Sequence, residues 1–151
     1  IERFTLFPFS PIRARMQLLA DYVKTATRDG KPLSDDPVIR QRIAQLATEC
    51  EVGRLLGVKF ITAAMHGGKT PTVEASCYKL YATELSLRIA NATMDIVGPG
   101  AQLALGTEDA PLRGRPERCY TYTVIDTIGG GSSEVQKNII ARRGLGLPKN
   151  F

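Results

Sequence analysis

Residues 36–68 read DPVIRQRIAQLATECEVGRLLGVKFITAAMHGG and carry the strongest periodic signal in the chain. Asp36 followed by Pro37 is a typical helix start, because aspartate accepts hydrogen bonds from free amides at an N-cap and proline suits the first helical position. Apolar and small residues then recur in alternating steps of four and three, which is the spacing of one helical face. The stretch therefore predicts a long bundle helix that ends at Gly67-Gly68. The residues of its face are Ile39, Ile43, Leu46, Cys50, Gly53, Gly57, Phe60 and Ala64.

A second helix is predicted before this one. Ser10-Pro11 repeats the start signal of a cap followed by proline, and apolar residues continue at helical spacing from Ile12 to Val23. We expect this helix to end at Gly30. The two glycines on the face of the long helix would let such a neighbour approach closely.

A third helix is predicted to begin at Thr70-Pro71 and to stop at Gly98. Its predicted face carries two polar residues, Glu84 and Asn91, near the centre. An unpaired carboxylate would be costly there, so each of the two needs a partner from another helix or another subunit. The apolar members of this face are Val73, Cys77, Leu80, Leu87 and Met94.

The tail of the chain, residues 125–148, reads IDTIGGGSSEVQKNIIARRGLGLP. Ser133 and Gln136 have the spacing of a capping box, which predicts a short final helix that ends at Gly144. Amides left free in its first turn, beside glycines that admit a ligand to the backbone, can hold a phosphate. An ordinary glycine hinge before a surface helix fits the same residues.

The predicted helices define the fold class. Residues 101–127 form a polar connection, and connections of this length are usually functional or contain some structure of their own. Strand alternation is weak throughout the chain, and its best case is Tyr120–Ile125. The sequence therefore predicts an all-α fold, an antiparallel up-and-down four-helix bundle.

Composition limits the class of protein further. At 151 residues with 43% hydrophobic content, the chain fits a single domain, residues 1–151, with one core. The three cysteines are widely spaced and form no CxxC pair, which argues against a disulfide framework and a metal site. The 20 basic residues are interspersed with 15 acidic ones, so a solvated surface is favoured over nucleic-acid binding. No leader and no membrane-spanning apolar run are visible, and we expect a cytoplasmic protein.

Four fragments resemble the C-terminal domain of the acyl-CoA dehydrogenase family, in that family's order and spacing. The resemblance covers nearly the whole chain and implies a flavoenzyme that uses FAD to desaturate an acyl-CoA thioester between Cα and Cβ. It also implies that the chain is the C-terminal fragment of a three-domain subunit, which forms a homodimer, a tetramer or a hetero-oligomer and passes electrons to an acceptor. The isolated fragment is expected to be inactive. The fragments are residues 28–33 (RDGKPL), 74–84 (EASCYKLYATE), 93–98 (TMDIVG) and 127–148.

The family places its catalytic base in one of two positions. One branch carries a glutamate directly before the Gly-Thr of the tail, and that position is Gly130 here, which cannot accept a proton. The other branch, which includes the isovaleryl and long-chain enzymes, carries a Glu-Arg pair at the start of the first helix, and Glu2-Arg3 matches it. The resemblance therefore nominates Glu2 as the base that takes the proton from Cα. Pro8 and Pro11 depart from the family pattern, because they interrupt a segment that relatives keep helical.

The resemblance also assigns residues of the tail to the flavin nucleotide. Ser132 and Glu134 occupy positions that contact the adenosine end of FAD in relatives, with serine in place of threonine and glutamate in place of glutamine. Both side chains keep their capacity for hydrogen bonds. The glycines before them, Gly130 and Gly131, belong to the same expected FAD contact.

A second expected FAD contact lies in a loop that reaches the flavin of a neighbouring subunit in relatives. Gly98 is retained there, whereas Asp95 replaces the family's glutamine and Pro99 replaces a glycine. Arg28 stands near the position of the family's pyrophosphate arginine, but not on it. His66, the only histidine, is expected at the exposed end of the long helix. These departures support an alternative function, in which the chain is a non-catalytic assembly module or partner subunit.

Overall fold

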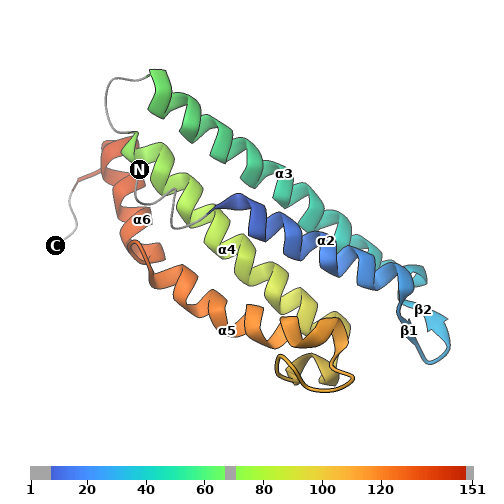
Figure 1. The fold of residues 1–151 in the computed structure, drawn as a ribbon. Coiled ribbons are helices and arrows are strands. Elements are labelled where there is room, and N and C mark those ends of the chain that lie inside the picture. The colour runs from blue at the N-terminus through green and yellow to red at the C-terminus, as the bar shows by residue number, and fades with distance from the viewer. Residues whose placement is uncertain (1–7, 67–70, 149–151) are drawn as a thin grey trace.

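A computed structural model describes residues 8–66 and 71–148, and Figure 1 shows their arrangement. Glu2 and the predicted helix boundaries at Gly67-Gly68 and Thr70 lie outside the described residues. The elements are α2 (Phe9–Thr25), β1 (Thr27–Arg28), β2 (Lys31–Pro32), a 3-10 turn (Leu33–Asp35), α3 (Pro37–His66), α4 (Thr72–Val97), 3-10 turns at Pro99–Gln102 and Pro111–Gly114, α5 (Arg115–Ile128), α6 (Ser133–Ile139) and a π-helical turn (Ile140–Gly144).

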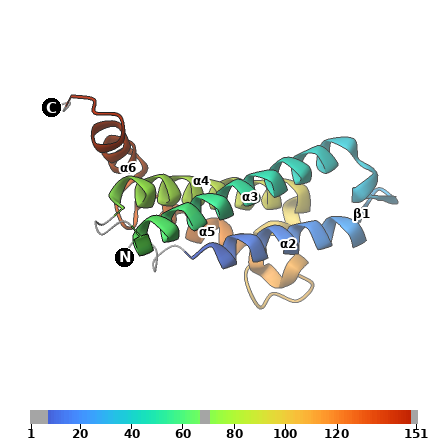
Figure 2. The same cartoon turned by 90° about the horizontal axis from the view of Figure 1, so that it is seen from above.

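Four antiparallel helices, α2 to α5, form an up-and-down bundle around a single apolar core (Figures 1 and 2). The predicted all-α fold class is therefore confirmed. Helix α4 is central, because it packs against α2, α3, α5 and α6. The short α6 crosses the end of the bundle where α4 begins (Figure 1). The fourth bundle helix is thus α5, and the tail helix that the sequence suggested is an addition to the bundle.

The interpretation of residues 101–127 as a connection missed α5. This helix begins after Gly114, which has a φ of 71°, and has Pro116 in its first turn. The weak strand pattern at Tyr120–Ile125 was misleading, since these residues are helical. Only Pro116 and Thr123 of α5 are buried, and its helically spaced apolar residues, Tyr120, Val124 and Ile128, are exposed.

The first helix differs from its prediction at both ends. It starts at Phe9, with Pro8 in the N-cap position, so Ser10 is not the cap. It stops at Thr25 rather than at Gly30, because the chain turns into the β1–β2 hairpin. Asp29 and Gly30 have φ values of 51° and 75°, the left-handed pair that a two-residue hairpin turn favours.

The long helix α3 agrees with its prediction most fully. The Asp36 carboxylate accepts hydrogen bonds from the amides of Val38, at 2.8 Å, and Ile39, at 3.3 Å, which confirms the cap. Most of the predicted face is buried, although Ile43 is only partly buried and Ala64 is exposed. The space left by the two glycines is filled by aromatic rings rather than by a neighbouring backbone: Phe9 lies over Gly53 and Tyr78 over Gly57.

The predicted face of α4 was wrong. All its apolar members are only half-buried, whereas the core side of α4 is formed by other residues. Because four other helices, α2, α3, α5 and α6, pack against α4, most of its circumference is covered and small or polar residues face its neighbours. Glu84 is half-exposed and has the partner that the sequence demanded, since Lys137 of α6 lies 3.8 Å from its carboxylate. The apolar core residues of α4 are Ala75, Tyr78, Ala82, Leu85, Ile89, Ala90, Ala92 and Ile96.

The remaining predictions concern cysteines, metals and membranes. All three thiols are free, with Cys50 buried and the other two half-buried. Residues 8–66 and 71–148 contain no cluster of three acidic, histidine or cysteine side chains that could hold a metal ion. Within the same residues, none of the helices combines the length and apolar character required to cross a bilayer.

Candidate functional site

The turn between α5 and α6, residues 129–132, has two successive glycines with positive φ values. Gly130 has a φ of 67° and Gly131 a φ of 98°, in the region that side chains avoid. A Cβ atom on Gly131 would also lie 2.7 Å from Nε2 of Gln136. We call residues 129–132 the glycine turn.

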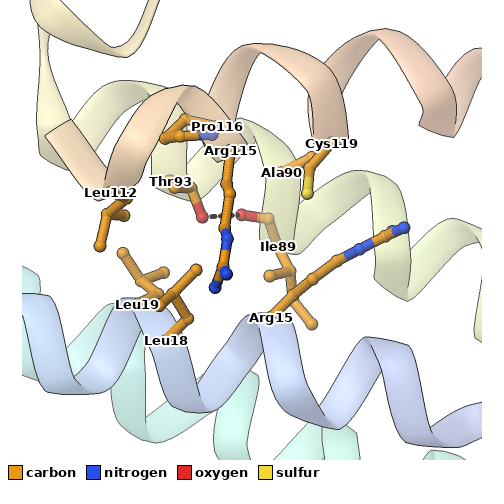
Figure 3. Close-up of a pocket in the computed structure, with 10 residues that line it drawn as sticks. All are labelled: Arg15, Leu18, Leu19, Ile89, Ala90, Thr93, Leu112, Arg115, Pro116 and Cys119. Carbon is orange, nitrogen blue, oxygen red and sulfur yellow. Dashed lines mark hydrogen bonds between the residues drawn. The ribbon is translucent and has the colours of Figure 1, made fainter. Parts of the chain in front are cut away.

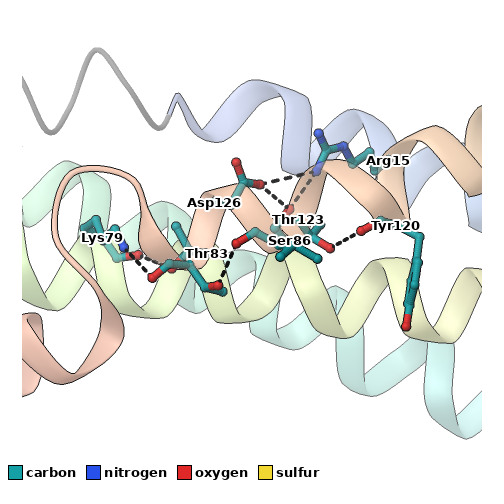
Figure 4. Close-up of polar contacts among 9 residues, drawn as sticks. Arg15, Lys79, Thr83, Ser86, Tyr120, Thr123 and Asp126 are labelled. Carbon is teal, nitrogen blue, oxygen red and sulfur yellow. Dashed lines mark hydrogen bonds and ion pairs between the residues drawn. The ribbon is translucent and has the colours of Figure 1, made fainter.

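Two buried side chains hold the carbonyl groups of the glycine turn. Nε2 of Gln136 donates to the carbonyl oxygens of Gly130, at 3.0 Å, and Gly131, at 3.1 Å. Nζ of Lys79, on α4, donates to the same Gly131 oxygen at 2.8 Å and to that of Thr127 at 3.4 Å. Both donor residues have no exposed surface. Figure 4 shows Lys79 reaching from α4 to the backbone that follows α5.

The carbonyl directions fix the directions of the amides. In a trans peptide group the C=O and the following N–H point in opposite directions. Because the carbonyls of Gly130 and Gly131 point to buried donors, the amides of Gly131 and Ser132 point away from them. Neither amide has a hydrogen-bond acceptor among the described residues. The glycine turn therefore has two amide donors that the described residues leave unused and that point away from Lys79 and Gln136.

The predicted capping box is shifted by one residue. Ser132, not Ser133, is the N-cap of α6, and its hydroxyl accepts a long hydrogen bond, 3.5 Å, from the amide of Val135. Gln136 does not reach back to the cap amide, since its side chain is turned inward to the two glycine carbonyls. Its Oε1 atom is buried without a partner among the described residues. The helical run ends at Gly144, as predicted, through a π-helical turn, although the glycine with a positive φ is Gly146.

Glu134 lies beside the glycine turn on the exposed face of α6. The hydroxyl of Ser132 and the amide of Glu134 itself lower the pKa of the Glu134 carboxyl. Both are hydrogen-bonding groups that favour the charged form. A carboxylate and a hydroxyl therefore flank the two free amides.

A polar network that the sequence patterns did not predict connects α2, α4 and α5 (Figure 4). Nη1 of Arg15 lies 2.6 Å from the Ser86 hydroxyl and 3.9 Å from the Asp126 carboxylate, and Ser86 donates to Asp126 at 3.3 Å. Burial raises the pKa of the Asp126 carboxyl, although Arg15 and Ser86 act in the opposite direction. A sequence signal existed, since Lys79, Thr83 and Ser86 form a polar stripe at helical spacing on α4.

The other predicted FAD residues gather at the opposite end of α4. Nη2 of Arg28, in the hairpin, donates to the Ile96 carbonyl at 2.6 Å, and Asp95 pairs with Arg42 at 2.8 Å. Gly98 ends α4 with a φ of 80°. At the helical rise of about 1.5 Å per residue, Gly98 lies about 29 Å along α4 from the buried lysine under the glycine turn. The two sets of residues are therefore separate sites on one chain.

A cavity of about 20 Å³ lies between α2, α4 and α5, enough for about one water molecule (Figure 3). Thr93 faces it, but the hydroxyl is used within α4, donating to the Ile89 carbonyl at 2.8 Å. The cavity is too small for an acyl chain or a flavin. Its lining residues are Arg15, Leu18, Leu19, Ile89, Ala90, Thr93, Leu112, Arg115, Pro116 and Cys119.

The three remaining site residues that the sequence suggested are His66, Gly130 and Glu2. His66 is the exposed last residue of α3, as expected, and its Nδ1 lies 3.0 Å from the Thr62 carbonyl. Gly130 is exposed and brings no carboxylate to the glycine turn. The nominated base, Glu2, is outside the described residues.

The helical bundle with its glycine turn has a counterpart among known protein families. The family model for the acyl-CoA dehydrogenase C-terminal domain matches residues 1–145. The chain belongs to this family.

Individual relatives agree with this assignment. The chain is 30% identical over 152 residues to acyl-CoA dehydrogenase FadE26 of Mycobacterium tuberculosis, covering 98% of this chain and 38% of the relative. It is 35% identical over 136 residues to acyl-CoA dehydrogenase IpdE1 of the same organism, and this match covers 87% of this chain and 32% of the relative. The chain thus spans about a third of the length of these relatives.

Solved structures show the same fold. The ChsE4–ChsE5 complex of Mycobacterium tuberculosis matches with a TM-score of 0.84 and 29% identity, covering 95% of this chain and 36% of that chain. The glutaryl-coenzyme A dehydrogenase complex with glutaryl-CoA matches with a TM-score of 0.80 and 26% identity, and the match covers 93% of this chain and 34% of that chain.

Proposed function

We propose that this chain is the C-terminal domain of an FAD-dependent acyl-CoA dehydrogenase, which oxidises an acyl-CoA thioester to its α,β-unsaturated product. The observation that carries the proposal is the family match over residues 1–145. In this reaction Cα loses a proton to a protein base and Cβ loses a hydride. Acyl-CoA, an electron acceptor and further domains of the same subunit are the proposed partners, and we propose a cytoplasmic location.

The residues of the glycine turn fit a nucleotide cofactor. The amides of Gly131 and Ser132, which the described residues leave unused, the Ser132 hydroxyl and the exposed Glu134 carboxylate offer both donors and acceptors within four residues. When bound, FAD would supply the acceptor for the hydride. In this proposal the glycine turn binds and orients the cofactor and takes no proton.

The residues at the hairpin end fit a second nucleotide contact less well. The Arg28 guanidinium already donates to the end of α4, and Asp95 is already paired with an arginine. Because this end lies about 29 Å from the glycine turn along α4, we propose that it serves the cofactor of a neighbouring subunit. Gly98 supplies the tight end of the helix that such a contact requires.

Glu2 is the proposed base, which removes the proton from Cα. Its position in a Glu-Arg pair and the lack of a carboxylate at Gly130 support this choice. The test is Glu2→Gln in the full-length protein, with Glu108→Gln, an exposed carboxylate in a loop, as control.

Glu2→Gln should retain FAD and lower kcat by at least about a hundredfold, because general-base catalysis typically contributes that much. The control should change kcat less than about twofold, because its carboxylate is exposed and takes no part in the proposed reaction. Undiminished dehydrogenation by Glu2→Gln would remove this residue from the mechanism.

A second candidate function is that of a partner subunit without its own turnover. The separation of the two sites and the departures at Asp95, Pro99 and Gly130 favour it. One of the structural relatives, ChsE4–ChsE5, is a complex of two differently named proteins. If the full-length protein, purified alone, binds FAD but does not turn over until a related second subunit is added, the partner role is supported.

A further inference from the structure

Lys79 is the feature of the bundle that the proposed function does not use. It lies on α4 with no exposed surface, between α4 and the end of α5. Burial of an ammonium group is costly unless hydrogen bonds compensate for the lost water. A buried lysine can nevertheless do what an apolar side chain cannot, which is to donate charge-assisted hydrogen bonds to the backbone.

Two hydrogen bonds of Lys79 reach the backbone at and after the end of α5. The Thr127 carbonyl belongs to the last turn of α5, where carbonyls lack intrahelical donors and the helix dipole is negative. The Gly131 carbonyl, four residues further, accepts from the same ammonium at the shorter distance of 2.8 Å. The lysine thus ties the end of α5 and the glycine turn to α4.

The hydrogen bond from Lys79 to the Gly131 carbonyl also strengthens the Ser132 amide as a donor, because this carbonyl and this amide belong to one peptide group. Hydrogen bonds polarise the groups through which they connect, so a donor on a carbonyl strengthens the N–H of that peptide. Lys79 acts in this way on the Gly131–Ser132 peptide, and Gln136 acts on the Gly130–Gly131 peptide. Both outward-facing amides therefore belong to peptide groups that a buried donor holds from inside.

The charge of Lys79 also reaches the outer face. It lowers the pKa of the Glu134 carboxyl, as the smallest of several influences led by the Ser132 hydroxyl, although Glu134 is exposed on α6.

We propose that Lys79 is a positioning residue for the flavin nucleotide: it holds and polarises the Gly131–Ser132 peptide so that the Ser132 amide donates to an oxygen of bound FAD. The proposal rests on the proposed function. Lys79 acts through the backbone and touches neither the cofactor nor the acyl group. The thioester carbonyl of the substrate is the other oxygen that these amides could serve, and the experiment separates the two.

The test uses the full-length protein with Lys79→Met, which keeps the length of the side chain and removes its charge. Thr83→Val is the matched control, because Thr83 is buried one turn further along α4 and its hydroxyl donates only to carbonyls of α4 itself, those of Lys79 and Leu80. The dissociation constant of FAD is measured for each apoprotein by quenching of flavin fluorescence. KM for the acyl-CoA is then measured at saturating FAD.

Lys79→Met should raise the dissociation constant of FAD by at least about tenfold, the effect of losing one well-placed hydrogen bond. Thr83→Val should change it less than about twofold, and KM should stay within about twofold for both, because neither side chain meets the acyl-CoA in this proposal. A purely structural role for Lys79 predicts equal losses in the two variants. Unchanged FAD affinity in Lys79→Met, with or without a higher KM for acyl-CoA, would overturn the proposal.

A second variant keeps the proposal testable if Lys79→Met does not fold. Lys79→Gln retains a neutral donor and should weaken FAD binding as well, because the charge is lost and the side chain is shorter. Equal affinity in Lys79→Gln and the unsubstituted protein would also contradict the proposal. If the unsubstituted protein binds no FAD at all, the proposed function fails. If the unsubstituted protein and the Lys79 variants bind FAD equally well, only the role proposed for Lys79 fails.

Discussion

The two ends of α4 are built differently, although both carry residues expected to meet a flavin. At the glycine turn, two side chains without exposed surface, Lys79 and Gln136, hold backbone carbonyls from inside. At the hairpin end, the contacts are made by exposed charges, Arg28 with a helix carbonyl and Arg42 with Asp95.

This difference indicates how precisely each end can place a ligand. Buried hydrogen bonds cannot be exchanged for water without loss, so they fix the orientation of the backbone that they hold. Exposed ion pairs contribute little and are screened by salt. The glycine turn is therefore the preorganised end, and the hairpin end is adaptable.

The largest expected effect comes from adding a methyl group at a left-handed glycine of each end. Gly131→Ala should cost about 2–4 kcal/mol of unfolding free energy, because the residue is strained and its Cβ would meet Gln136. Gly30, in the hairpin turn, also has a positive φ, 75°, but no atom lies within 4 Å of a Cβ added there. Gly30→Ala should therefore lower the free energy of unfolding by only about 1 kcal/mol. Urea denaturation of both variants measures the difference. Equal costs would mean that the glycine turn is not tightly held.

A pH effect is expected at Asp126, in the polar network beside the glycine turn. Burial raises its pKa above the ordinary value of 3.8. The protonated carboxyl therefore contributes to the free energy of unfolding. This contribution is fully present below the pKa that Asp126 has in the unfolded chain, and it is lost as the pH rises through the higher pKa of the folded protein. Asp126→Asn cannot ionise, so its stability relative to the unsubstituted protein should increase with pH across this window and then level off.

The measurement for Asp126 is urea denaturation of both proteins at a series of pH values from below 3.8 to neutrality. Ser86→Ala is a useful companion, because it removes a hydrogen bond to the carboxylate and should enlarge the effect. A stability difference that is constant with pH, or that runs in the opposite direction, would contradict the buried environment of this carboxyl.

The smallest effect is expected at the hairpin end. Asp95→Asn removes the ion pair with Arg42, in which the Arg42 and Asp95 side chains are 41% and 63% exposed. Such pairs contribute about 0.2–1 kcal/mol, and the contribution falls as salt screens it. Thermal unfolding at low and high salt should therefore show a small difference that disappears at high salt. A loss above about 2 kcal/mol would remove the contrast between the two ends.

The sequence predicted those elements whose buried face is apolar. Helix α3 has a cap at Asp36 and a stripe of apolar and small residues, and both appear in the structure. Helix α5 carries apolar residues at helical spacing, Tyr120, Val124 and Ile128, but they lie on its exposed side, and only Pro116 and Thr123 are buried. On α4 the half-buried apolar residues gave a misleading face, since polar residues such as Lys79 and Ser86 occupy the covered sides.

The candidate site was predictable in part for a similar reason. Three successive glycines before a capped helix marked the turn, because positive φ values demand glycine. The donors that hold the turn were not predictable from local patterns, since Lys79 lies 52 residues from Gly131 in sequence and meets it only after α4 packs against α5. Glu2 remains a prediction from the resemblance to the family.

Hydrogen exchange at the glycine turn of the full-length protein, measured by mass spectrometry with and without FAD, tests the central claim most directly. We expect the amides of Gly131 and Ser132 to exchange rapidly without the cofactor, because they have no acceptor among the described residues, and to become protected when FAD binds. The loop at residues 104–109, exposed and remote from the turn, should not change. Amides that are already protected without FAD, or that stay unprotected when FAD is bound, would contradict the account.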